Sequence, residues 1–78
     1  MWRVNVPNHI KVAVTKFPRR DADLIFATLR AMRDDPLADE VYALESHSYY
    51  RVVAGHLVFF DLLPSEHVAN VIAVERRH

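Results

Sequence analysis

The fold is decided by residues 49–63, YYRVVAGHLVFFDLL. Residues 49–53 and 57–63 are rich in valine and aromatic side chains, which favour β-strands. Between them lies an Ala-Gly pair, in which Gly55 supplies the positive φ angle that a tight hairpin turn needs. The second run would promote aggregation at an exposed sheet edge, so we expect strands on both of its sides. This segment therefore predicts a β-hairpin inside a larger sheet.

Further strands are expected on either side of the hairpin. Residues 68–76 form a strong strand candidate after the turn at residues 64–66, and residues 41–45 form a weaker one. Near the start of the chain, residues 2–6 alternate between apolar and polar side chains, and Pro7 ends that strand.

Two helices are expected between the first strand and the hairpin. Residues 7–17 fit both an alternating pattern and a helical stripe, and we favour the helix because Pro7 suits a first-turn position. After Pro18 the helical pattern is clearer, with arginines near its end, and Pro36 stops the helix. The apolar face of this second helix comprises Leu24, Ile25, Thr28, Leu29 and Met32.

The order strand, helix, helix and then three or four strands is typical of the α+β class. It predicts a small antiparallel sheet with two helices packed on one face. A chain of 78 residues is enough for one small domain, so we expect residues 1–78 to form a single unit.

The composition excludes several classes of protein. Without cysteine, disulfide scaffolds and thiol chemistry are excluded. The longest apolar stretch, residues 52–63, contains His56 and Asp61 and is too short to span a bilayer, and the first residues lack a signal-peptide pattern. The five histidines are too far apart for a local zinc motif. We therefore expect a cytoplasmic protein with no membrane partner, no metal and no cofactor.

The charge is balanced overall but unevenly distributed. Ten basic and ten acidic residues cancel. Residues 1–33 nevertheless carry seven basic and two acidic residues, residues 34–75 carry eight acidic residues and one arginine, and residues 76–78 are basic. A fold that brings the basic ends of the chain together would create a local anion site on a neutral protein. The alternative is an ordinary solvated surface.

Six stretches follow one another in an informative order. They are the opening strand and helix leading to Phe17-Pro18, residues 29–36, Leu44, residues 50–55, residues 57–60 and residues 74–78. In this order and spacing, over almost the whole chain, they resemble the RelE/ParE superfamily of bacterial toxins from type II toxin-antitoxin systems. None of these stretches is specific alone.

The resemblance implies a βααβββ fold and a toxin that a cognate antitoxin holds inactive in a hetero-oligomeric complex. Members of this superfamily either cleave mRNA, often on the ribosome, or poison DNA gyrase. The ribonucleases attack a phosphodiester with its own 2′-hydroxyl, which requires a base, an acid and fixed cations. The first hypothesis is therefore an mRNA endoribonuclease, with mRNA and the ribosome as further partners.

Site residues are carried over from the superfamily one position at a time. Arg51 matches the basic residue of its Tyr-Arg strand. Arg77 or Arg76 matches the arginine near the end of its last strand. His78 matches either the residue beyond that arginine or the near-terminal histidine that acts as acid or base in the YoeB branch. His56 and Glu75 are further candidates for proton transfer. Because residues 49 and 51 share one side of a strand, Tyr49 is expected beside Arg51 on an open face, where its ring could stack on a base. The candidates for RNA binding are Arg76, Tyr49, Lys11 and Lys16.

Two departures from the superfamily keep a second hypothesis open. Leu57 stands where an arginine is usual, and Val53 stands in the strand where RelE members have catalytic lysines. The alternative is a gyrase poison of the ParE type, or a toxin relative that has lost catalysis and acts only by binding. For Arg51 itself, the alternative to a catalytic role is a structural one, in which it lies on a face of the sheet and pairs with Asp61 or Glu45.

Overall fold

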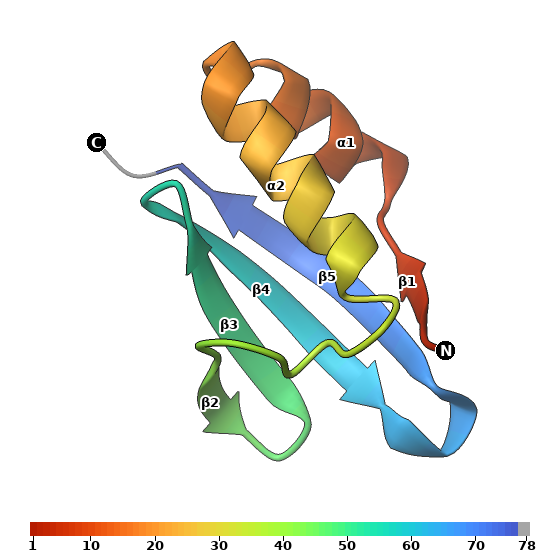
Figure 1. Ribbon diagram of the computed structural model, residues 1–78. Helices are drawn as coiled ribbons and strands as arrows, with labels where there is room; N and C mark the ends of the chain where they lie inside the picture. The colour runs from red at the N-terminus through yellow and green to blue at the C-terminus, as the bar shows by residue number, and fades with distance from the viewer. Residues whose placement is uncertain (77–78) are drawn as a thin grey trace.

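The computed structural model describes residues 1–76, in which two α-helices pack on one face of a five-stranded sheet (Figure 1). The α+β class and the expected order of elements are confirmed. Within residues 1–76, neither α-helix is long and apolar enough to cross a membrane. In chain order the elements are β1 (Arg3–Asn5), α1 (Asn8–Thr15), α2 (Arg19–Ala31), β2 (Tyr42–Glu45), β3 (Ser48–Val53), β4 (His56–Leu63), a 3-10 turn (Pro64–Glu66) and β5 (Val68–Glu75).

Both α-helices begin directly after a proline, Pro7 for α1 and Pro18 for α2. The fixed φ angle of proline suits the start of a helix, and its missing N–H costs nothing there. The helical interpretation of residues 7–17 is thus confirmed over the alternating one. The helices bury apolar residues spaced three, four or seven apart, which are Ile10 and Val14 of α1 and Ala22, Ile25 and Leu29 of α2.

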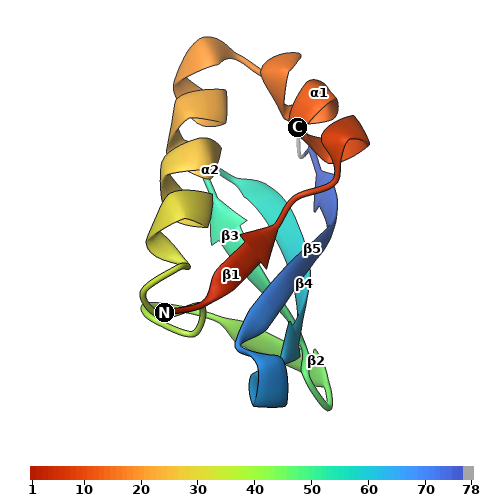
Figure 2. The ribbon, with the colours of Figure 1, turned by 90° about the vertical axis from the view of Figure 1, so that its right-hand side faces the viewer.

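The strands are arranged in the order β1-β5-β4-β3-β2. The last four strands pair antiparallel, as expected from their short connections. β1 differs, because it lies parallel to β5 with Arg3 opposite Val68. A hairpin cannot join parallel strands, and here the chain passes through both helices and three strands before it returns to β1. Figure 2 shows β1 in front, where it forms one edge of the sheet.

The core lies between the helices and the sheet. Along β4, Val58, Phe60 and Leu62 are buried and point toward the helices, as the two-residue period of a strand requires. The opposite face has no helix on it. There the rings of Tyr42, Tyr50 and Phe59 form a row across three strands, with centroids 5.1 Å and 5.8 Å apart.

The β3–β4 turn allows a test of the hairpin geometry. Ala54 and Gly55 both have positive φ angles, 53° and 81°. Asn enters this region more readily than Ala, so Ala54→Asn should raise the free energy of unfolding by about 0.5 kcal/mol. Gly55→Ala should lower it by about 1 kcal/mol through backbone strain alone, because its new Cβ would meet no atom within 4 Å. Urea unfolding of both variants checks the prediction, and equal effects would contradict it.

Candidate functional site

Arg51 lies on the helix-covered face of the sheet, and the prediction that it shares an open face with Tyr49 is wrong. The two residues do share a side, but Tyr49 packs against the core and its ring stacks on Phe60 with centroids 5.8 Å apart. Arg51 is 6% exposed. Alternation along a strand determines which residues share a side, whereas the packing of the helices determines which side is covered.

The guanidinium of Arg51 links β3 by hydrogen bonds to the segment that follows α2. Its Nη2 donates hydrogen bonds to the carbonyl oxygens of Pro36, at 2.6 Å, and Ala38, at 3.2 Å. The same group lies 5.7 Å from the ring centroid of Phe60. Burial lowers the pKa of Arg51, while Asp39 and Asp35 act in the opposite direction. Both of these bonds use Nη2, whereas the buried Nε of Arg51 has no hydrogen-bond partner among the described residues.

The alternative partners predicted for Arg51 are not those it uses. Asp61 instead accepts a hydrogen bond from Ser48 Oγ at 2.7 Å, and the partners of Arg51 are backbone carbonyls in a coil. Coil carbonyls carry no signal in a sequence, so this arrangement could not be predicted.

His56 is buried at the start of β4 and binds α2. Its Nε2 is 2.9 Å from Asp21 Oδ2, and its ring lies against Phe17 with centroids 4.7 Å apart. Arg76, just beyond β5, places its guanidinium 5.8 Å from the centroid of the same Phe17 ring. We call Phe17, Asp21, His56 and Arg76 the terminal cluster. It brings together two of the predicted site residues, His56 and Arg76.

Two other predicted catalytic residues, Arg77 and His78, lie outside the described residues. Lys16 is exposed just after α1, and Tyr49 is in the core layer, so neither joins the terminal cluster. Within residues 1–76, no group of three or more histidine or acidic side chains is placed to hold a metal ion.

The helix-free face carries Leu57, at the position where the sequence comparison had led us to expect an arginine, whereas Val53 packs against the core. Leu57 lies opposite Val52 on one side and Glu75 on the other, so this row across three strands holds no cation. The shallow depression beside it is lined by Tyr42, Tyr50, Val52, Leu57 and Phe59, again without a cation. Phosphate recognition on this part of the sheet is therefore not supported by its side chains.

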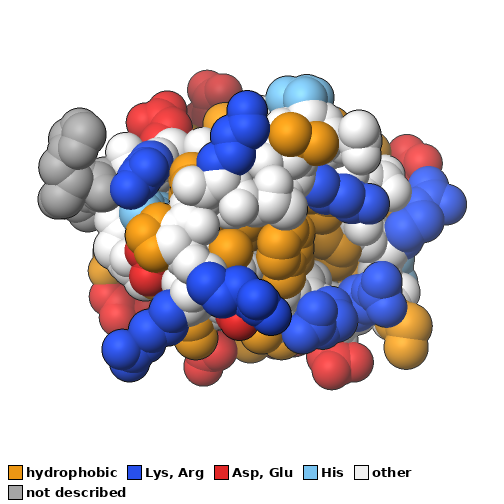
Figure 3. All heavy atoms as spheres, turned by 90° about the horizontal axis from the view of Figure 1, so that it is seen from above, with side chains coloured by type: hydrophobic (Ala, Val, Ile, Leu, Met, Phe, Trp, Pro, Cys, Tyr) orange, Lys and Arg blue, Asp and Glu red, His pale blue; other side chains and the backbone are white. Residues whose placement is uncertain are grey.

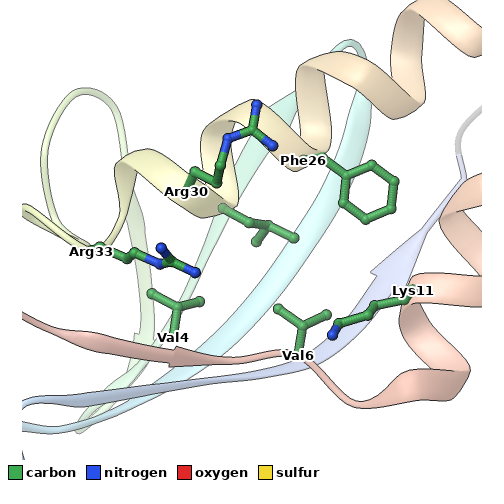
Figure 4. A pocket seen from close by; sticks show the side chains of 7 residues that line it. Val4, Val6, Lys11, Phe26, Arg30 and Arg33 are labelled. Carbon is green, nitrogen blue, oxygen red and sulfur yellow. The ribbon is translucent and has the colours of Figure 1, made fainter.

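A basic groove that sequence reasoning missed lies between α2 and β1. It has a volume of about 190 Å³, and its lining residues are Val4, Val6, Lys11, Phe26, Leu29, Arg30 and Arg33. Figure 4 shows the valines below Arg30 and Arg33, with Lys11 at one end. On the molecular surface, blue Lys and Arg side chains surround a patch of hydrophobic atoms (Figure 3).

One signal in the sequence pointed to this groove. Phe26, Arg30 and Arg33 are spaced four and three apart, a helical spacing that aligns Phe26 and Arg30 of α2 with Arg33 in the turn just after it. Lys11, one of the RNA-binding candidates, lines this groove, but its place beside Arg30 could not be predicted because it depends on how α1 packs against β1.

Comparisons with known proteins show what the chain resembles in structure. No protein-family model matches the sequence, and no curated protein matches it. Several solved structures match at low sequence identity, and three of them are described here. A chain of the archaeal RelE-RelB complex from Pyrococcus horikoshii OT3 matches with a TM-score of 0.88 and 16% identity, covering 97% of this chain and 94% of that one. The isolated E. coli RelE toxin matches with a TM-score of 0.80 and 11% identity, covering 100% of this chain and 86% of that one. The intact E. coli RelBE toxin-antitoxin complex matches with a TM-score of 0.76 and 12% identity, covering 100% and 99%.

Proposed function

Because this chain has the fold of the RelE toxins, we propose that it is the toxin component of a toxin-antitoxin system and is neutralised by a cognate antitoxin. The observation that carries the proposal is the match over 97% of the chain to part of a RelE-RelB complex, at a TM-score of 0.88. A second matching structure is also a toxin-antitoxin complex. Similarity over nearly the full length of both chains supports a shared architecture for partner binding.

The first candidate activity is cleavage of mRNA at the end of the sheet where β5 stops. Arg76 and His56 both pack against the Phe17 ring there, His56 is bound to Asp21, and Arg77 and His78 follow Arg76 in the sequence. In this chemistry a base removes the proton of the 2′-hydroxyl, whose oxygen bonds to phosphorus as the 5′-oxygen leaves. An acid protonates the leaving oxygen, and a guanidinium stabilises the charged transition state. The products are a 2′,3′-cyclic phosphate and a 5′-hydroxyl.

The second candidate activity is action by binding alone, either on DNA gyrase or on the antitoxin only. It is favoured by the engagement of Arg51 and His56, which are 6% and 4% exposed and are bound to protein groups. The row formed by Val52, Leu57 and Glu75 also offers no cation to a phosphate. A protein with these features could keep the toxin architecture without its ribonuclease chemistry.

Inducing the chain in a bacterium, with and without the product of the adjacent small gene, tests these proposals. We expect growth arrest with the chain alone, and growth together with a purifiable complex when both proteins are made. Mapping mRNA 5′ ends then separates the activities. The control variant is Arg19→Ala, because Arg19 is exposed and pairs only with Asp23, at 3.4 Å, among the ion pairs of the described residues. Cuts that disappear in Arg76→Ala but persist in Arg19→Ala would establish cleavage that depends on Arg76. Arrest without cuts would establish binding. A chain that neither arrests growth nor forms a complex would contradict the toxin assignment.

A further inference from the structure

We infer that the helix-free face of the sheet binds a basic segment of a target protein, in which arginine or lysine side chains stand among apolar ones. This inference rests on the proposed function, because it gives a chemistry to the target of the binding-only activity. The partner in question is the target and not the antitoxin.

The centre of the helix-free face is apolar. Five side chains line its shallow depression, which are Tyr42, Tyr50, Val52, Leu57 and Phe59. They come from two adjacent rows across β2, β3 and β4. Tyr42 is 40% exposed and Val52 is 46% exposed. An exposed apolar patch that is bordered by polar residues is typical of a protein–protein contact, whereas a small ligand needs a deeper cavity.

Two carboxylates lie on opposite sides of this depression. On β2, the Tyr42 hydroxyl donates a hydrogen bond to Glu40 Oε1, which holds this carboxylate beside the aromatic row. On β5, Glu75 is exposed and lies opposite Leu57. Neither Glu40 nor Glu75 forms an ion pair within residues 1–76. Both charges are therefore available to a cation from a partner.

A third carboxylate belongs to the next row, which crosses β3 at Ser48. Because Ser48 and Tyr50 are two residues apart on one strand, this row lies on the same face. Asp61 lies opposite Ser48, whose Oγ donates a hydrogen bond to it at 2.7 Å. We call Glu40, Asp61 and Glu75 the acidic rim. Across β2–β5, the three rows contain no lysine or arginine.

A basic protein segment fits both the apolar centre and the acidic rim. The aliphatic stems of lysine and arginine pack on apolar surface, while their charged heads extend beyond it. On the helix-free face, stems that lie over the depression would bring their heads to the carboxylates around it. Complementary charge of this kind gives a contact its specificity.

The same charges disfavour two other occupants. The phosphates of a nucleic acid need cations, and these three rows hold none across β2–β5. A second copy of the chain that docked through the same face would bring two acidic rims together, and like charges across an interface are costly. A basic segment of another protein meets neither obstacle.

The test compares two valine-to-arginine variants of the full chain. Val52 lies in the depression and Val12 lies on α1, and each is 46% exposed. The probe is a short synthetic peptide of arginine and valine, and its control has glutamate in place of every arginine. By calorimetry, we expect the unmodified chain to prefer the arginine peptide by at least about tenfold. Val52→Arg should bind it at least about tenfold more weakly, and Val12→Arg should stay within about twofold of the unmodified chain.

A second measurement connects the face with the toxin activity. In a bacterium, we expect Val52→Arg to lose growth arrest and Val12→Arg to retain it. Circular dichroism checks that both variants are folded, and both should still form the complex with the product of the adjacent gene.

The outcomes separate this inference from the toxin assignment. Equal affinities for the two peptides, equal losses in the two variants, or full growth arrest by Val52→Arg would overturn the inference and leave the toxin assignment intact. If Val52→Arg lost the complex with the adjacent gene product, the face would belong to the antitoxin instead. An unmodified chain that neither arrested growth nor formed that complex would overturn both.

Discussion

Replacing Arg51 by alanine is expected to lower the free energy of unfolding by about 3 kcal/mol. The substitution removes both hydrogen bonds to the carbonyls of Pro36 and Ala38 and the contact with the Phe60 ring. It also leaves the buried carbonyl group of Pro36 without this donor, which costs more than the loss of the bond itself. Chemical denaturation followed by circular dichroism measures the change.

Arg51→Lys is the matched variant. An ammonium keeps the charge but lacks the planar fork of the guanidinium, so we expect a loss about half as large. Arg20→Ala, at an exposed position, should change stability by less than about 0.5 kcal/mol. If Arg51→Ala retained full stability yet abolished mRNA cleavage, the guanidinium would serve the RNA and its structural role would be refuted.

Phe60→Ala should have a still larger effect, about 4 kcal/mol, whereas Phe59→Ala should cost about 1 kcal/mol. Phe60 is fully buried beneath the helices, where its ring contacts Tyr49 and Arg51. Phe59 lies on the helix-free face and is half-buried. The loss at position 60 is comparable with the whole stability of a domain of this size, so Phe60→Ala is expected to be largely unfolded at 37 °C.

The contrast between these neighbouring residues is measured by thermal denaturation of the two variants. Phe60→Leu provides a milder change at the same site, and its loss should fall between the two. Similar midpoints for Phe59→Ala and Phe60→Ala would mean that the helices do not cover only one face of β4.

Local sequence patterns predicted most of the elements because their causes are local. Pro7 and Pro18 mark the starts of both helices, and Gly55 marks the turn between the two best strands. The weakest strand candidate, residues 41–45, is present as Tyr42–Glu45. It gave a weak signal because all four residues are exposed, so burial imposed no alternation on them.

The predicted site was less accurate because it depended on tertiary packing. Tyr49 and Arg51 share a side of β3 as expected, but nothing in the strand itself indicated that the helices cover that side. The parallel pairing of β1 with β5 joins residues far apart in the chain, which no local pattern encodes. The basic groove likewise depends on packing that brings Lys11 of α1 and Arg30 of α2 to the same hollow beside β1.

The pairing of β1 with β5 also determines when β1 can join the sheet during synthesis of the chain. Asn5 lies beside Asn70 and donates a hydrogen bond to it across a separation of 65 residues. Because synthesis adds roughly 5–20 residues per second, β5 is made several seconds after β1. A chain that ends before Val68 has no strand to hold β1 in place, and without β1 the groove loses one wall. Only a completed polypeptide therefore carries the groove.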